Sequence, residues 1–117
     1  LVVRPTHDDG WHAVLRQVAA MCKYALSRDG VIDVGRMAAR LGLTEAVIRH
    51  SLLWQAASGL VQVQAWLDGD RAAIVAGSGL ADTSQMVVLQ DELEALLAEV
   101  RAYRQFVRRA RVEDLEL

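Results

Sequence analysis

Hydrophobic residues recur every three or four positions between Trp11 and Leu26, which is the spacing of one face of an amphipathic helix. Gly30 follows and suits the left-handed backbone that often ends a helix. After it, Val31 and Ile32 predict a short strand able to pair with a later hairpin. The first thirty residues or so are therefore expected to give a helix and then a short strand.

Two short helices are predicted on either side of the turn Leu41-Gly42-Leu43. Asp33 is expected to cap the first helix and Thr44 the second, because their side-chain oxygens accept from unpaired amides of the first turn. Gly42 permits the positive φ that a tight turn requires. Gly59 ends the second helix, and alternating residues on both sides of Asp68-Gly69 then predict a two-residue hairpin. This order is typical of a winged helix-turn-helix.

A long helix is predicted for the last third of the chain, beginning near Asp82-Thr83-Ser84. Its apolar residues alternate by four and three, which is the heptad seam of a coiled coil. Leu97 and Phe106 widen the seam beyond a strict two-stranded stripe. The seam residues are Leu89, Leu93, Leu96, Val100, Tyr103 and Val107. This pattern is compatible either with packing against the rest of the chain or with dimerisation.

The fold class is thus mostly α with a small β-hairpin, an α+β arrangement. We expect a winged helix-turn-helix at 1–80 and a C-terminal packing or dimerisation helix at 81–117. One departure from the usual winged-helix pattern occurs in the second short helix. Gln55 occupies a position that is expected to face inward, whereas Leu53 and Trp54 occupy positions that are usually polar. Either this helix is rotated or extended, or the long helix or a partner protein covers Leu53 and Trp54.

Composition limits the functional classes. A chain of 117 residues with 53% hydrophobic residues is long enough for one aliphatic core without disulfides or metal. The single cysteine, Cys22, fits a cytoplasmic protein, and no membrane-spanning segment is predicted. The chain lacks a starting methionine and is expected to be a piece of a longer protein.

Candidate nucleic-acid contacts are few, and the formal net charge of −2 disfavours strong nonspecific binding. The candidates lie on the two short helices and the hairpin: Arg36, Arg40, Thr44, Arg49, His50 and Arg71. Glu45 and the acidic hairpin tip would repel phosphate, so a solvated surface is an equal alternative for the second helix. Arginines 101, 104, 108 and 111 share one face of the long helix, either as a solvated face or as a phosphate-tracking stripe.

Catalysis has little support in the sequence. The histidines are scattered and show no metal-ligand spacing with Cys22. Neither a phosphate-cradling glycine loop nor a nucleophile elbow occurs. We therefore predict no catalytic residue, no metal, no cofactor and no small-molecule ligand.

Two stretches resemble known bacterial proteins. Residues 30–63, which include Ala38-Ala39-Arg40-Leu41-Gly42-Leu43-Thr44, resemble many bacterial winged-helix domains. Residues 97–110 resemble the C-terminal accessory region of RecJ-type single-strand DNA exonucleases, although that family's metal-binding Asp/His motifs do not occur in this sequence. The resemblance implies a small module that assists DNA binding or partner contact beside a catalytic portion.

Three hypotheses follow. The first is a non-catalytic winged-helix accessory domain of a bacterial DNA-processing protein, which binds single- or double-stranded DNA with modest, salt-dependent affinity. The second is a protein-interaction module whose heptad helix forms a homodimer or pairs with another part of a larger chain. The third combines both as a small dimeric winged-helix transcription regulator.

Overall fold

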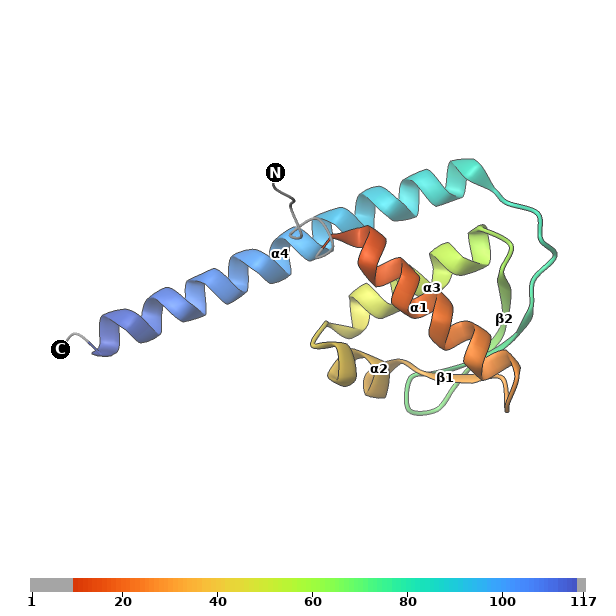
Figure 1. The fold of residues 1–117 in the computed structure, drawn as a ribbon, viewed down its shortest axis with the longest axis horizontal. Helices are drawn as coiled ribbons and strands as arrows, with labels where there is room; N and C mark the ends of the chain where they lie inside the picture. Colours follow the sequence, from red (N-terminus) through yellow and green to blue (C-terminus); the bar gives the residue numbers. More distant parts are fainter. Residues whose placement is uncertain (1–9, 116–117) are drawn as a thin grey trace, which may run out of the picture.

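The described residues form four helices and three strands (Figure 1). The structure is a computed structural model that describes residues 10–115, with side chains described as far as Arg109. The elements, in chain order, are α1 (Trp11–Leu26), β1 (Val31–Asp33), α2 (Val34–Leu41), α3 (Glu45–Ala57), β2 (Val61–Leu67), β3 (Arg71–Ala76) and α4 (Thr83–Leu115). The protein is therefore mostly helical with a small antiparallel sheet, as the sequence predicts.

The turn between α2 and α3 forms through the local signals that the sequence contains. The Asp33 carboxylate accepts from the backbone N–H of Arg36 at 3.0 Å and caps α2. Gly42 ends this helix with φ +69°, a left-handed conformation that glycine adopts without steric cost. Thr44 Oγ1 then accepts from the backbone N–H of Val47 at 3.2 Å and caps α3. The predictions for Asp33, Gly42 and Thr44 are confirmed.

The sheet is antiparallel in the order β1-β3-β2. Val31 pairs with Ala73, so the short strand after α1 joins the later hairpin as predicted. The prediction of a two-residue turn is wrong: Leu67 pairs with Arg71, and residues 68–70 separate the strands. Gly69 and Asp70 both have positive φ, 75° and 59°, so the left-handed backbone continues one residue beyond the Asp-Gly pair.

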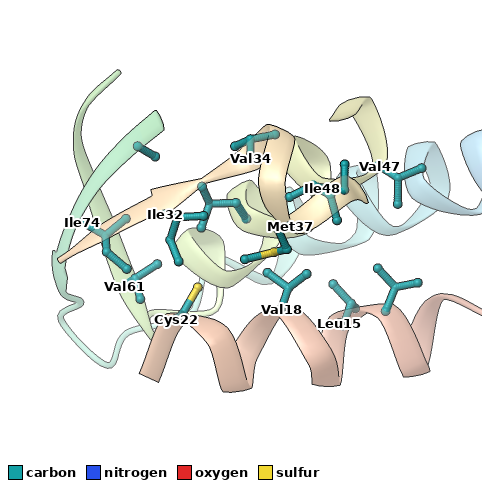
Figure 2. Packing of buried hydrophobic residues seen from close by; sticks show 14 of the residues in the cluster. Leu15, Val18, Cys22, Ile32, Val34, Met37, Val47, Ile48, Val61 and Ile74 are labelled. Carbon is teal, nitrogen blue, oxygen red and sulfur yellow. The ribbon is translucent and has the colours of Figure 1, made fainter. Parts of the chain in front are cut away.

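The buried cluster lies between α1, the sheet, α2 and α3 (Figure 2). Val18 and Cys22 point from α1 towards Met37 and Ile48 on the two short helices. Leu93 and Leu97 of α4 belong to the same buried cluster. The long helix is therefore part of the core over its first turns.

Cys22 is fully buried in this cluster, and burial raises the pKa of its thiol from 9.0 to about 11. We expect a thiol reagent at pH 8 to modify Cys22 only in denaturant, because the nucleophile is the thiolate. Stability is expected to fall as pH rises from about 9 towards 11, since the thiol of the unfolded chain ionises first. Alkylation monitored by mass spectrometry checks the reactivity, and rapid labelling of the native protein would contradict it.

The connection from β3 to α4 is fixed by backbone contacts with the end of α3. Gly79 N–H donates to Gly59 O at 3.0 Å, and Asp82 N–H donates to Ala57 O at 2.8 Å. A Cβ at Gly59 would lie 2.7 Å from the backbone nitrogen of Leu80, and a Cβ at Gly77 would lie 2.3 Å from Gly59 O. Only glycine fits this backbone-to-backbone approach, which sets where α4 begins.

α4 crosses the rest of the protein and then continues beyond it (Figure 1). Leu89, Leu93 and Leu97 are buried, and they recur every four residues on one face. Between residues 101 and 109, Val107 is half-buried and the other side chains are exposed. The part of α4 from residue 101 to 115 is about 20 Å long at 1.5 Å per residue.

Candidate functional site

Arg49 on α3 is held by two carboxylates. Its Nη1 lies 2.7 Å from Asp70 Oδ2 at the hairpin tip and 3.8 Å from Glu45 Oε1 one helical turn earlier. The side chain is 41% exposed, so these ion pairs contribute little to stability. They do neutralise the one arginine among the predicted nucleic-acid contacts on α3.

α4 covers another face of α3. His50 Nδ1 lies 3.1 Å from Ala46 O, and its Nε2 lies 3.2 Å from Glu92 Oε1 on α4. Thr44 is engaged as the helix cap. A helix that enters a major groove needs its outer face open, and part of the outer face of α3 is occupied by α4.

The remaining predicted contacts are the arginines of α2 and the hairpin. Arg36 and Arg40 are exposed on α2 and line a hollow of about 270 Å³ with Arg28, which does not include Arg49. Arg71 Nε donates to Asp68 O within the hairpin. Arg71 pairs in register with Asp33, and Val34 N–H donates to Asp70 O, so the start of α2 lies beside the hairpin tip that holds Arg49.

The side chain of Gln55 explains the unusual polarity of α3. Gln55 is 2% exposed and donates from Nε2 to Leu15 O on α1 at 3.0 Å. It occupies the inward position, and the hydrogen bond satisfies its amide. Trp54 is half-buried against the core, with its indole Nε1 buried and unpartnered within the described residues, whereas Leu53 remains exposed.

The heptad seam of α4 divides near Val100. Leu89 and Leu93 are buried and Leu96 and Val100 are half-buried, so this part, the proximal seam, packs inside the protein. Beyond it, Tyr103 and Phe106 are each 69% exposed, and Val107 is half-buried. We call residues 103, 106 and 107 the distal seam. The distal seam is the exposed continuation of an apolar stripe that elsewhere forms core.

Two hollows flank α4 where it passes the α2–α3 turn. One, the apolar groove, measures about 550 Å³ and is lined by Leu43, Ala46, Leu96, Val100 and Tyr103 among others. The other, the arginine cleft, measures about 470 Å³ and contains Arg101, Arg104 and Arg108. Arg104 lines both hollows, and its Nη2 donates to Gly42 O across the turn.

The sequence pattern missed both hollows as sites, because each needs a wall from a distant part of the chain. The apolar groove joins α4 to residues 42–46, and the arginine cleft joins α4 to Gln17 on α1. The spacing of the arginines on α4 was the available signal for the second hollow.

Comparison with protein-family models, curated proteins and solved structures found no match. None of the helices in the described part of the chain combines the length and hydropathy needed to cross a membrane. Within residues 10–115, no three His, Cys, Asp or Glu side chains are grouped so that they could hold a metal ion.

Proposed function

We propose that this chain is a non-catalytic winged-helix interaction domain that pairs with a second copy of itself through the distal seam of α4. The order α1-β1-α2-α3-β2-β3 and the sheet order β1-β3-β2 support the winged-helix assignment. The tight turn at Gly42, between α2 and α3, supports it further.

The observation that carries the pairing is the exposure of Tyr103, which lines the apolar groove, and of Phe106 on the next turn of α4. Full burial of an aromatic side chain stabilises an interface by about 2–3 kcal/mol relative to exposure. Beyond Arg101 most described side chains of α4 are exposed, and helix propensity alone adds little stability to such turns. A second copy would bury both aromatic rings and would support the projecting turns of α4.

The charges of α4 favour an antiparallel pair. Acidic residues lie at 91, 92, 94 and 99, and arginines follow at 101, 104, 108, 109 and 111, before Glu113 and Asp114 near the end of the helix. A parallel pair would align like charges, whereas an antiparallel pair places the acidic half of one helix beside the basic half of the other. The same twofold arrangement lets Phe106 of each copy approach the apolar groove of the other.

DNA reading through α3 is the weaker proposal. Arg49 is engaged by Asp70 and Glu45, and α4 occupies part of the outer face of the helix. The resemblance to the accessory region of RecJ-type exonucleases stays a prediction. A dimeric transcription regulator is compatible with the proposed pairing only if each copy binds duplex DNA through a surface other than the outer face of α3.

Sedimentation velocity over a range of concentrations tests the pairing. We expect the wild-type chain to show twice the monomer mass at high concentration and to dissociate on dilution. Phe106→Glu is expected to weaken the dimer at least tenfold, because it places a carboxylate in an apolar interface. Val87→Glu is the matched control, since Val87 is an exposed apolar residue on the proximal part of α4. A wild type that remains monomeric at the highest concentration, or an equal effect of both variants, would contradict the proposal.

A further inference from the structure

A hollow of about 270 Å³ lies between the last turns of α1, β1 and α2, and we call it the α1–α2 hollow. Ala25, Ile32 and Met37 line it and belong to the buried core, and Met21 packs against that core, so the floor of the hollow is apolar. Methionine side chains adapt to apolar partners of irregular shape. The volume lies below the roughly 300–1,000 Å³ of pockets that enclose a small molecule, so the hollow is better suited to a single apolar side chain.

Three arginines also line the hollow. Arg36 and Arg40 are exposed on one face of α2, about 6 Å apart along the helix at 1.5 Å per residue. Arg28 lies just beyond α1, with its guanidinium carbon 4.9 Å from the centre of the Tyr24 ring. Within the described part of the chain, neither Arg36 nor Arg40 forms an ion pair with a carboxylate. Their guanidinium charges can therefore engage an anionic group from outside.

Arg36 and Arg40 do not support the helix that carries them. Arg36 is the third residue of α2, where the positive end of the helix dipole disfavours a cation. Arg40 follows four residues later, and like charges at that spacing destabilise a helix. Two arginines that oppose their own helix and have no carboxylate partner within the described residues are better explained by a ligand than by folding.

Two aspartates line the same hollow and narrow the choice of ligand. Asp29 Oδ1 accepts from Val31 N–H at 3.2 Å, and Asp33 Oδ1 accepts from Arg36 N–H at 3.0 Å. Each carboxylate has a second oxygen that can accept from a donor of the ligand. The phosphodiester backbone of DNA offers acceptors without donors, and its charge would be repelled by both aspartates. A peptide offers backbone N–H donors, carboxylates and apolar side chains together.

We propose that the α1–α2 hollow binds an acidic peptide segment of a partner protein. One apolar side chain of the segment occupies the floor, and two flanking carboxylates pair with Arg36 and Arg40. Carboxylates four residues apart on a helix, or two residues apart on an extended strand, are separated by about 6–7 Å and match the spacing of the two arginines. Guanidinium–carboxylate pairs of this kind fix orientation as well as adding affinity. Tyr24, which is 57% exposed, provides an aromatic surface at the side of the site.

The α1–α2 hollow is separate from the pairing proposed above. Its lining residues all lie between positions 21 and 40, whereas the pairing uses α4 and the groove beside the α2–α3 turn. None of its arginines is assigned to the acidic half of a second copy. A chain that fails to dimerise can still bind the peptide, so the two proposals fail independently.

Fluorescence anisotropy with a labelled peptide of about ten residues, titrated with the full chain at low salt, tests the site. The probe carries one leucine with a pair of glutamates on each side. We expect Arg36→Gln/Arg40→Gln to weaken binding at least tenfold with unchanged circular dichroism, because two charge-assisted contacts are lost. Arg108→Gln/Arg109→Gln removes the same charge from α4 and is the matched control, which is expected to leave the affinity unchanged.

Altered probes identify the chemistry of the ligand. Replacing the leucine of the peptide by glycine, or its glutamates by glutamines, is expected to weaken binding at least tenfold. An oligothymidylate of equal charge is expected to compete at least tenfold less well than the unlabelled peptide. An oligothymidylate that competes equally, or a glycine peptide that binds as tightly as the leucine peptide, would contradict the assignment to an acidic peptide with an apolar anchor. Absence of peptide binding at low salt, or an equal loss in the α4 control, would overturn the site itself.

Discussion

Leu93→Asp is expected to lower the free energy of unfolding by about 4–5 kcal/mol, which approaches the whole stability of the less stable single domains. Leu93 is fully buried and packs in the same cluster as residues of α1 and α3. The variant loses the packing of a buried leucine, which costs about 3–5 kcal/mol, and adds a carboxylate without a partner. Urea denaturation followed by circular dichroism measures the loss.

Val87→Asp is the matched control, because Val87 is exposed on the same helix and its replacement should change stability by less than about 0.5 kcal/mol. The comparison also distinguishes whether the heptad residues near Leu93 form the core of one chain or an interface between two chains. A Leu93→Asp chain that stays folded but loses its dimer would show that the proximal seam is an interface and not core.

The second large effect is expected for Gln55→Glu, which should cost about 3 kcal/mol or more at neutral pH. Gln55 is nearly fully buried, and its amide donates to Leu15 O. An introduced carboxylate would face a carbonyl oxygen, so two acceptors would lie together without a proton between them. Thermal and urea unfolding at several pH values measure the cost.

The pH dependence of this variant follows from burial, which raises the pKa of the introduced carboxyl above its unfolded value of about 4.3. Below about pH 4.3 the carboxyl is protonated in both states and can donate to Leu15 O, so the difference from wild type is small. Above that pH the unfolded chain ionises first, and the variant loses stability relative to wild type as pH rises. Gln55→Met keeps the shape without the amide and should cost less than about 1 kcal/mol. A Gln55→Glu chain as stable as the methionine variant at pH 7 would show that the position is hydrated.

Local signals in the sequence were sufficient for the helical part of the fold. The Asp33 and Thr44 caps and the left-handed Gly42 depend on residues within three positions of one another, so they form as the pattern predicts. The turn between β2 and β3 has three residues, and not the two that were predicted, because Asp70 also adopts positive φ. Aspartate adopts positive φ more readily than most residues.

The features that could not be predicted from the sequence depend on contacts between residues that are far apart in the chain. Arg49 carries a charge suited to DNA, but its pairing with Asp70 depends on how the hairpin folds towards α3. The heptad pattern of α4 fixes which residues share a face but not what covers that face. Gln55 was recognised as an exception, whereas its acceptor on α1, forty residues earlier, could not be predicted from spacing.

Amide hydrogen exchange along α4, measured at several protein concentrations, tests most directly whether this helix serves as core in one half and as an interface in the other. We predict that amides from Leu89 to Val100 exchange as slowly as those of α1 at every concentration. Amides from Arg101 to Arg109 are expected to exchange faster on dilution, and in Phe106→Glu at all concentrations. Slow exchange of Arg101–Arg109 that is unaffected by dilution or by Phe106→Glu would contradict this division of α4.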